Sequence, residues 1–403
     1  MTNLKTRNGK NPLSVYVHFP YCDIKCPFCN LNAWESKKFD EALYVRALES
    51  ELKALSALMP ELRAGEVETV FMGGGTPSLF SQSAVARVMN AVASRCAVAE
   101  GAEVSLEAHP LSCDVLRLKG YTGAGVNRLS IGAQSFDSEK LKRLGRGHGA
   151  ETCSEAVKNA RAAGFENLSV DIIAGAPGET ARAFREDIKK AGETGANHVS
   201  VYGLEIEKGT RFHARARSGE LKLPSAGEMA DMADAAVSEL RARGMERYEI
   251  SSFALPDGAC RHNINYWRSG NYIGIGAGAH SHLTTAGAPF GLRWANTRNP
   301  AEYMEKAARG ELAPMREMDA ETGFSDCVMM GLRLTEGMNL RDAEKKFGVR
   351  TDRDSLRKLE RGGFVLERGQ NLQITVKGLA VANSIIAEIT GKAVAEHPAG
   401  NLI

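Results

Sequence analysis

The sequence predicts an α/β protein, a partial (β/α)6 barrel followed by a small winged-helix-like α+β domain. Between residues 15 and 243, short β-branched and apolar runs alternate with longer segments of helical period. Beyond residue 300, three helical segments precede two short β-like runs. We therefore expect the barrel in residues 1–250, a connecting segment in 251–299 and the second domain in 300–403.

The barrel prediction rests on six strand and helix pairs. Strands are expected at 15–19, 68–72, 103–107, 128–131, 169–173 and 198–201. Helices are expected at 42–58, 84–93, 114–119, 152–163, 181–191 and 226–243. This order predicts a parallel sheet with right-handed crossovers, and six units are too few for the eight of a closed barrel. Ligands of such sheets bind beyond the carboxyl ends of the strands.

The second domain has the element order of a winged helix, a fold that often binds DNA. We expect helices at 324–334, 340–347 and 351–361, a hairpin from 363–367 and 371–375, and a last helix at 376–389. Residues 301–403 contain 15 Lys and Arg against 16 Asp and Glu. Nucleic-acid binding requires an excess of positive charge, so we expect no nucleic-acid partner.

The composition indicates where in the cell the protein works and which partners it lacks. The whole chain has 51 Lys and Arg against 49 Asp and Glu. This small net charge produces no overall electrostatic attraction for nucleic acid or an anionic membrane. No apolar run approaches the ~18–20 residues of a membrane span, and the first residues lack a secretory signal. We expect a cytoplasmic protein without a transmembrane segment, whose eight cysteines are reduced thiols.

Three of those cysteines, Cys22, Cys26 and Cys29, follow the first predicted strand in a CxxxCxxC pattern. Structural zinc normally takes four ligands in paired knuckles, and no second pair exists downstream. Three thiolates on a four-iron cluster would instead leave one iron open to bind a ligand. The pattern, with Phe28 before the last cysteine, resembles the radical S-adenosylmethionine superfamily. The resemblance implies a [4Fe–4S] cluster whose open iron binds S-adenosylmethionine and whose electron cleaves it to a 5′-deoxyadenosyl radical.

Residues at the carboxyl ends of the predicted strands are consistent with such a cleft. Tyr16 and His18 alternate with apolar residues and so share the opposite face of their strand. Glycines at 73–75 let backbone approach a ligand closely. Arg146 could hold a carboxylate in two hydrogen bonds, and Asp171 could accept from ribose hydroxyls. Singly each is more often structural, but together they favour a ligand site.

The resemblance narrows further to the oxygen-independent coproporphyrinogen oxidase-like, or HemN-like, family. It rests on the segments YVHFPYC, FMGGGTPSL, RLSIGAQSF, LGRGH, VDIIAGAPGET and GLRLTEG. Carried over by motif, it implies an S-adenosylmethionine site formed by Tyr16, Phe28, Gly74, Gly75, Thr76, Glu107, Gln134, Arg146 and Asp171. The chain departs from HemN itself, because Leu31 replaces a fourth cysteine and only fourteen residues precede the first strand.

Within that family the chain resembles the HemW branch, taken to be heme chaperones that deliver heme to hemoproteins. That branch carries an HNxxYW motif, here residues 262–267. A histidine can ligate heme iron, and aromatic rings can lie against a porphyrin, so His262, Tyr266 and Trp267 are candidate heme residues. The structural alternative, which the sequence leaves equally open, is that Tyr266 and Trp267 pack in the core and His262 caps a turn.

Three function classes follow. The first is a heme-binding carrier with heme and acceptor hemoproteins as partners. The second is an enzyme, either a coproporphyrinogen oxidase or a HemN-like methyltransferase acting on a porphyrin. The third is a winged-helix regulator with a metal knuckle, which the charge count disfavours. The sequence leaves open whether S-adenosylmethionine is consumed and whether the chain forms a homodimer.

Overall fold

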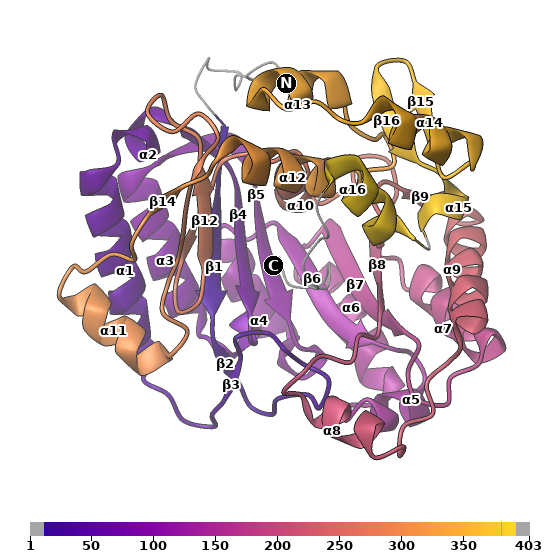
Figure 1. The fold of residues 1–403 in the computed structure, drawn as a ribbon. Coiled ribbons are helices and arrows are strands. Elements are labelled where there is room, and N and C mark those ends of the chain that lie inside the picture. Colours follow the sequence, from indigo (N-terminus) through magenta and orange to yellow (C-terminus); the bar gives the residue numbers. More distant parts are fainter. Residues whose placement is uncertain (1–11, 380, 392–403) are drawn as a thin grey trace.

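The computed structural model describes residues 12–379 and 381–391 and confirms the α/β partial barrel (Figure 1). All six predicted barrel strands are present. They are β1 (Pro12–Phe19), β4 (Glu66–Gly74), β5 (Ala97–Ala108), β6 (Arg128–Gln134), β7 (Asn167–Ala174) and β8 (His198–Gly203). They pair in parallel in this order, and their register places Tyr16 beside Phe71 and His18 beside Gly73.

The predicted helices form the outer layer of the barrel. They are α1 (Glu41–Leu58), α3 (Gln82–Arg95), α4 (Val115–Gly123), α6 (Ala150–Ala162), α7 (Ala181–Glu193) and α9 (Ala226–Arg241). The sequence also specifies where they start: Asp40, for example, accepts a hydrogen bond from the Leu43 amide at 2.8 Å and caps α1. The main core lies between these helices and the sheet, where Val15, Val17 and Phe19 are buried. Tyr16 instead packs with Phe71 inside the barrel.

Both edges of the sheet are extended by elements that the sequence did not predict. At the β8 edge lie β10 (Ser252–Ala254) and β9 (Glu246–Arg247). At the β1 edge lie, in order, β11 (Tyr272–Ile275), β12 (His280–Leu283), β13 (Leu292–Ala295) and β14 (Arg316–Glu317). Within the described residues, β14 and β9 end a twelve-stranded sheet without pairing to each other, so the barrel stays open.

Shorter elements complete the barrel region. The segment from Cys22, in β2 (Tyr21–Cys22), to β3 (Trp34–Glu35) carries the three cysteines and is called the cysteine loop below. It lies at the carboxyl ends of the barrel strands. The remaining helices are α2 (Pro60–Ala64), α5 (Ser138–Arg143), α8 (Arg211–Arg217), α10 (Arg261–Trp267) and α11 (Pro300–Ala308). No helix in residues 12–379 or 381–391 is long and apolar enough to cross a membrane.

The C-terminal elements have the predicted order and their own core. They are α12 (Ala320–Gly331), α13 (Leu340–Phe347), α14 (Arg353–Arg361), β15 (Val365–Arg368), β16 (Asn371–Ile374), α15 (Val376–Leu379) and α16 (Ala382–Thr390). One last helix was expected, but two form, because Val381 has φ −129° and ψ 26°, outside the helical region. In Figure 1 these elements lie at the amino ends of the barrel strands, away from the cysteine loop.

Candidate functional site

The cysteine loop brings three free thiols to the carboxyl ends of the strands. Cys22 is 9% exposed, whereas Cys26 and Cys29 are partly exposed. The Cys29 amide donates to the Cys26 carbonyl at 3.1 Å, which turns the chain tightly between these two cysteines. Across residues 12–379 and 381–391, no group of three His, Cys, Asp or Glu side chains is arranged to hold a single metal ion. The described residues therefore offer no ligand group for a single zinc ion, as a structural metal knuckle would require.

Two donors reach the cysteine sulfurs from other elements. The Thr76 hydroxyl donates to Cys22 Sγ at 3.3 Å, and Arg146 Nη1 donates to Cys26 Sγ at 3.1 Å. Burial raises the pKa of Cys22 to about 11 and also raises that of Cys29. These thiols therefore lose their protons when a metal binds rather than beforehand. A loop of thiols with hydrogen-bond donors aimed at sulfur suits an iron–sulfur cluster.

The glycine turn after β4 packs against the cysteine loop. The Gly75 amide donates to the Phe19 carbonyl at 2.7 Å, and the Thr76 amide donates to the Tyr21 carbonyl at 2.9 Å. A Cβ on Gly75 would lie 2.7 Å from the Tyr21 oxygen, closer than Cβ atoms come. Gly74 has φ +114°, a conformation that glycine adopts without strain. Glycine is therefore required here by this close approach as well as by backbone conformation.

Two carboxyl groups, Glu107 and Asp171, lie inside the barrel. Glu107 Oε2 accepts from the Gly74 amide at 3.1 Å, and Asp171 accepts from the Ser130 hydroxyl at 3.1 and 3.2 Å. Burial, together with the charge of Asp171, raises the pKa of Glu107 to about 8. Burial also raises the pKa of Asp171. The pair is thus electrostatically coupled and favours hydrogen-bond donors or positive charge between its members.

Gln134 and Arg146 meet above Gly132. Gln134 has φ +68°, an uncommon conformation for a residue other than glycine. A Cβ on Gly132 would lie 3.1 Å from Gln134 Nε2 and 3.8 Å from Arg146 Nη2. Arg146 Nη2 donates to the Gly132 carbonyl at 2.9 Å while Nη1 holds Cys26. Arg146 therefore fixes the cysteine loop against the end of β6.

Phe28 is held by a helix that the sequence analysis missed. Its ring packs edge-on against Phe212 of α8, with ring centroids 6.2 Å apart. The Phe212 amide donates to the Pro27 carbonyl at 2.9 Å, and Arg211 donates to the Lys25 carbonyl. Helix α8 has only seven residues and carries no motif known for catalysis. Its three arginines are the only feature of its sequence that could have drawn attention to it.

His18 and Asn32 form a second support for the loop. The Tyr16 hydroxyl and His18 Nδ1 are 3.0 Å apart, and His18 Nε2 lies 3.0 Å from the Asn32 carbonyl. Asn32 Nδ2 donates to the carbonyls of Ala277 and Arg298 at 2.9 and 3.0 Å. Burial lowers the pKa of His18 to about 4, so the imidazole is neutral. The role of Asn32 could not be predicted from the sequence, because the carbonyls it binds lie far along the chain.

The HNxxYW motif forms α10 at the other end of the barrel. His262 is completely buried, with Nδ1 2.7 Å from the Thr69 hydroxyl and Nε2 2.8 Å from the Tyr266 hydroxyl. Its pKa is lowered to about 3, by burial first and then by nearby Arg128. Both ring nitrogens are engaged, so heme ligation by His262 requires at least one of these hydrogen bonds to break. The assignment of His262 to heme stays a prediction.

The same helix connects the barrel with the C-terminal domain. Tyr266 and Trp267 pack with Met330 and Leu334, and the Arg333 guanidinium lies 4.2 Å from the Trp267 ring centroid. This position is consistent with the core interpretation of the motif. In Figure 1, α10 lies at the opposite strand ends from β2 and β3, which flank the cysteine loop.

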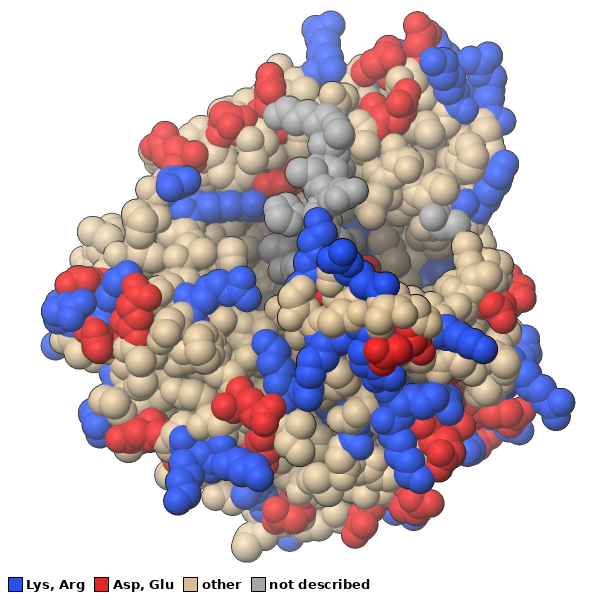
Figure 2. All heavy atoms as spheres, turned by 60° about the horizontal axis from the view of Figure 1, so that its bottom comes forward, with Lys and Arg blue, Asp and Glu red and all other residues tan. Residues whose placement is uncertain are grey.

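The face that carries the cysteine loop is rich in basic side chains. Figure 2 turns this face forward and shows many Lys and Arg side chains, with Asp and Glu side chains among them, beside a central hollow. α8, which is held against the cysteine loop, contributes Arg211, Arg215 and Arg217. The arginines of α8 favour anionic groups of a ligand at this face.

Comparisons with known proteins agree with this geometry. The family model described as "Radical SAM superfamily" matches residues 16–191, and that of the HemN C-terminal domain matches residues 321–381. The chain is 35% identical to heme chaperone HemW of Escherichia coli K12, over 93% of this chain and 97% of that relative. It is 32% identical to the mitochondrial radical S-adenosyl methionine domain-containing protein 1 of Bos taurus, over 95% and 88%.

Among solved structures, coproporphyrinogen III oxidase (HemN) from Escherichia coli has the same fold. Its TM-score is 0.78, with coverage of 94% of this chain and 90% of that chain. The sequence identity of the aligned pair is 22%, so this likeness supports the fold and not the reaction.

Proposed function

The chain belongs to the HemW family of radical S-adenosylmethionine proteins, and on that premise we propose that it binds heme and delivers it to hemoproteins. The observation that carries the proposal is the match, along nearly the whole chain, to relatives named heme chaperone. Acceptor hemoproteins are the proposed protein partners, and the cytoplasm is the proposed location.

Membership of the radical S-adenosylmethionine superfamily implies a [4Fe–4S] cluster and S-adenosylmethionine. We propose Cys22, Cys26 and Cys29 as the cluster ligands, with Thr76 and Arg146 as donors to sulfur. These three cysteines would hold a cluster that, when bound and reduced, would supply an electron for the cleavage of S-adenosylmethionine. Thr76 and Arg146 keep the loop in place through their contacts with Cys22 and Cys26.

For S-adenosylmethionine we propose the set at the strand ends. Gly74, Gly75 and Thr76 offer backbone at the turn, and Gln134 and Arg146 lie beside it. Tyr16, Glu107 and Asp171 line the adjacent interior, with Phe28 on the loop above. The coupled carboxyl pair suits the hydroxyl and amino donors of this ligand.

The proposal is tested by reconstituting the cluster under anaerobic conditions and titrating the protein with heme. Holoprotein is then mixed with an apo-hemoprotein, with and without S-adenosylmethionine. We expect a Soret band on titration and its transfer to the acceptor. A protein that binds no heme at micromolar concentration contradicts the chaperone function.

The enzyme alternative is tested in the same preparation. Coproporphyrinogen replaces heme, and 5′-deoxyadenosine and protoporphyrinogen are measured. Abundant protoporphyrinogen would overturn the carrier in favour of an oxidase, whereas a methylated porphyrin would point to a methyltransferase.

The heme ligand is tested with His262→Ala, read against Thr69→Val. Both variants remove the hydrogen bond between Thr69 and His262, but only the first removes the imidazole. Loss or shift of the Soret band in His262→Ala alone supports ligation. An unchanged Soret band in His262→Ala refutes it.

A further inference from the structure

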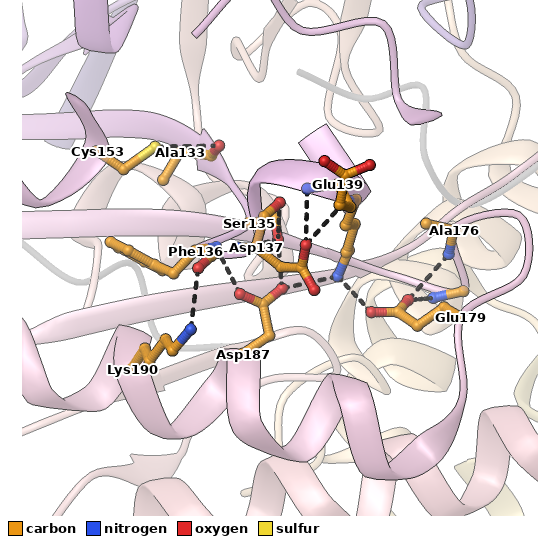
Figure 3. A network of polar contacts seen from close by, with 12 residues as sticks. Ala133, Ser135, Phe136, Asp137, Glu139, Cys153, Ala176, Glu179, Asp187 and Lys190 are labelled. Atoms are coloured by element: carbon orange, nitrogen blue, oxygen red, sulfur yellow. Dashed lines mark hydrogen bonds and ion pairs between the residues drawn. The ribbon is translucent and has the colours of Figure 1, made fainter. Parts of the chain in front are cut away.

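A buried ion cluster, drawn in Figure 3, joins the turns after β6 and β7 and has no assigned role. Lys140 Nζ, on α5, lies 2.6 Å from Glu179 Oε1 and 2.9 Å from Asp187 Oδ2. The side chains of Lys140, Glu179 and Asp187 are only 2%, 1% and 1% exposed. A buried cluster of this kind gives little net stability over well-packed apolar residues, so its geometry calls for another explanation.

The two carboxylates hold two different turns at the carboxyl ends of the strands. Asp187 accepts from the Phe136 amide at 2.5 Å and from the Ser135 hydroxyl at 2.6 Å, in the turn after β6. Glu179 accepts from the Gly175 and Ala176 amides at 2.8 and 3.0 Å, in the turn after β7. One ammonium group therefore joins two neighbouring turns, as the dashed contacts in Figure 3 show.

The turn after β6 and helix α5 adjoin two of the proposed ligand residues. Gln134, with φ +68°, immediately precedes Ser135. Arg146 follows α5, and its amide donates to the Leu141 carbonyl at 2.9 Å. Because Lys140 anchors α5, its position also determines where Arg146 meets Cys26.

We infer that Lys140 is a positioning residue for S-adenosylmethionine binding, acting through Glu179 and Asp187 on the turns after β6 and β7. The inference rests on the proposed function, since it assumes that Gln134 and Arg146 contact this ligand. Loss of the ammonium leaves two buried carboxylates that repel each other and both turns without their common anchor.

The test compares Lys140→Met with wild type after anaerobic reconstitution of the cluster. We measure the S-adenosylmethionine dissociation constant and the electron paramagnetic resonance spectrum of the reduced cluster before and after adding S-adenosylmethionine. We expect normal iron content in the variant, a dissociation constant raised by about 10- to 100-fold, and a smaller ligand-induced spectral change.

Glu344→Gln in the C-terminal domain is the matched control. Glu344 accepts from the Thr351 amide at 2.8 Å and from Arg353 at 2.5 Å, so it is also a shielded carboxylate bound to an amide and a cation. We expect this variant to lose stability without a change in S-adenosylmethionine affinity. Equal weakening of affinity in both variants would mean that general destabilisation, not positioning, is responsible.

Glu179→Gln provides a second measurement should Lys140→Met not fold. The glutamine carbonyl can still accept from the two amides, but the ion pair with Lys140 is lost, so we expect a smaller rise in the dissociation constant. Wild-type affinity in a folded Lys140 or Glu179 variant overturns the inference alone. Wild-type protein that does not bind S-adenosylmethionine instead contradicts the proposed function.

Discussion

Replacing Gly74 with alanine tests the close packing of the glycine turn on the cysteine loop. The added Cβ would lie 2.5 Å from His18 Cε1 and 2.6 Å from Nδ1. Moving the imidazole away would break its hydrogen bonds with the Tyr16 hydroxyl and the Asn32 carbonyl, both at 3.0 Å, and would therefore cost free energy. Alanine would also be forced to adopt φ +114°.

The two costs can be separated with a second glycine. A backbone held at such a φ costs about 1–3 kcal/mol for alanine. Overpacking against His18 adds roughly another 1–3 kcal/mol. Gly164 has φ +95°, and nothing lies within 4 Å of its added Cβ, so Gly164→Ala carries the first cost without the second.

Urea unfolding of both variants, with S-adenosylmethionine titrations of the reconstituted proteins, checks this reasoning. We expect Gly74→Ala to lose more unfolding free energy than Gly164→Ala and to be the only one of the two with weakened ligand binding. The reasoning is refuted if the two variants unfold alike and Gly74→Ala binds S-adenosylmethionine as wild type does.

Three further predictions follow from the site and its surroundings. Glu107 has a folded-state pKa of about 8 against 4.5 for an ordinary carboxyl, so the folded protein binds more protons between these values and loses stability as the pH rises through them. Glu107→Gln should flatten that dependence in apoprotein unfolding measured from pH 5 to pH 8.5, and an unchanged slope contradicts the assignment. Alanine at Cys22, Cys26 or Cys29 should abolish the iron content and visible absorbance of the reconstituted protein, whereas Cys96→Ala should keep both. Trp267→Ala should lower the unfolding free energy by about 3–5 kcal/mol through its lost contacts with α12 and Arg333, whereas Trp267→Phe should cost less.

The barrel could be predicted because its signals are local. Each parallel strand of the barrel is a short run with β-branched and apolar residues, and each predicted helix has a helical period, so the six strands β1, β4, β5, β6, β7 and β8 and the helices α1, α3, α4, α6, α7 and α9 were predicted. The candidate site residues could be proposed for a related reason. Parallel strands bring their carboxyl ends to one edge, so polar residues after successive strands come together without any contact being known.

The remaining features depend on distant pairings. Strands β9 to β14 have two to four residues each, too short for a periodic pattern, and pair at the sheet edges only once the barrel exists. Asn32 and Lys140 likewise find their partners far along the chain. For His262, the residue types alone could not distinguish a ligand from a core residue, and only the structure shows both ring nitrogens engaged.

The interior of the barrel joins the two candidate sites through one stack of rings. Phe71 stacks on Tyr16 with ring centroids 6.3 Å apart, and on His262 with centroids 5.1 Å apart. Tyr16 in turn holds His18.

A movement that frees His262 for heme iron therefore disturbs the wall proposed for S-adenosylmethionine, so the two ligands should be energetically coupled. Coupling of binding is reciprocal, so S-adenosylmethionine must change heme affinity by the same factor by which heme changes S-adenosylmethionine affinity. Two titrations on the reconstituted protein measure both factors, and Phe71→Leu should reduce them together. Heme affinity that is indifferent to S-adenosylmethionine would show that heme binds without opening α10.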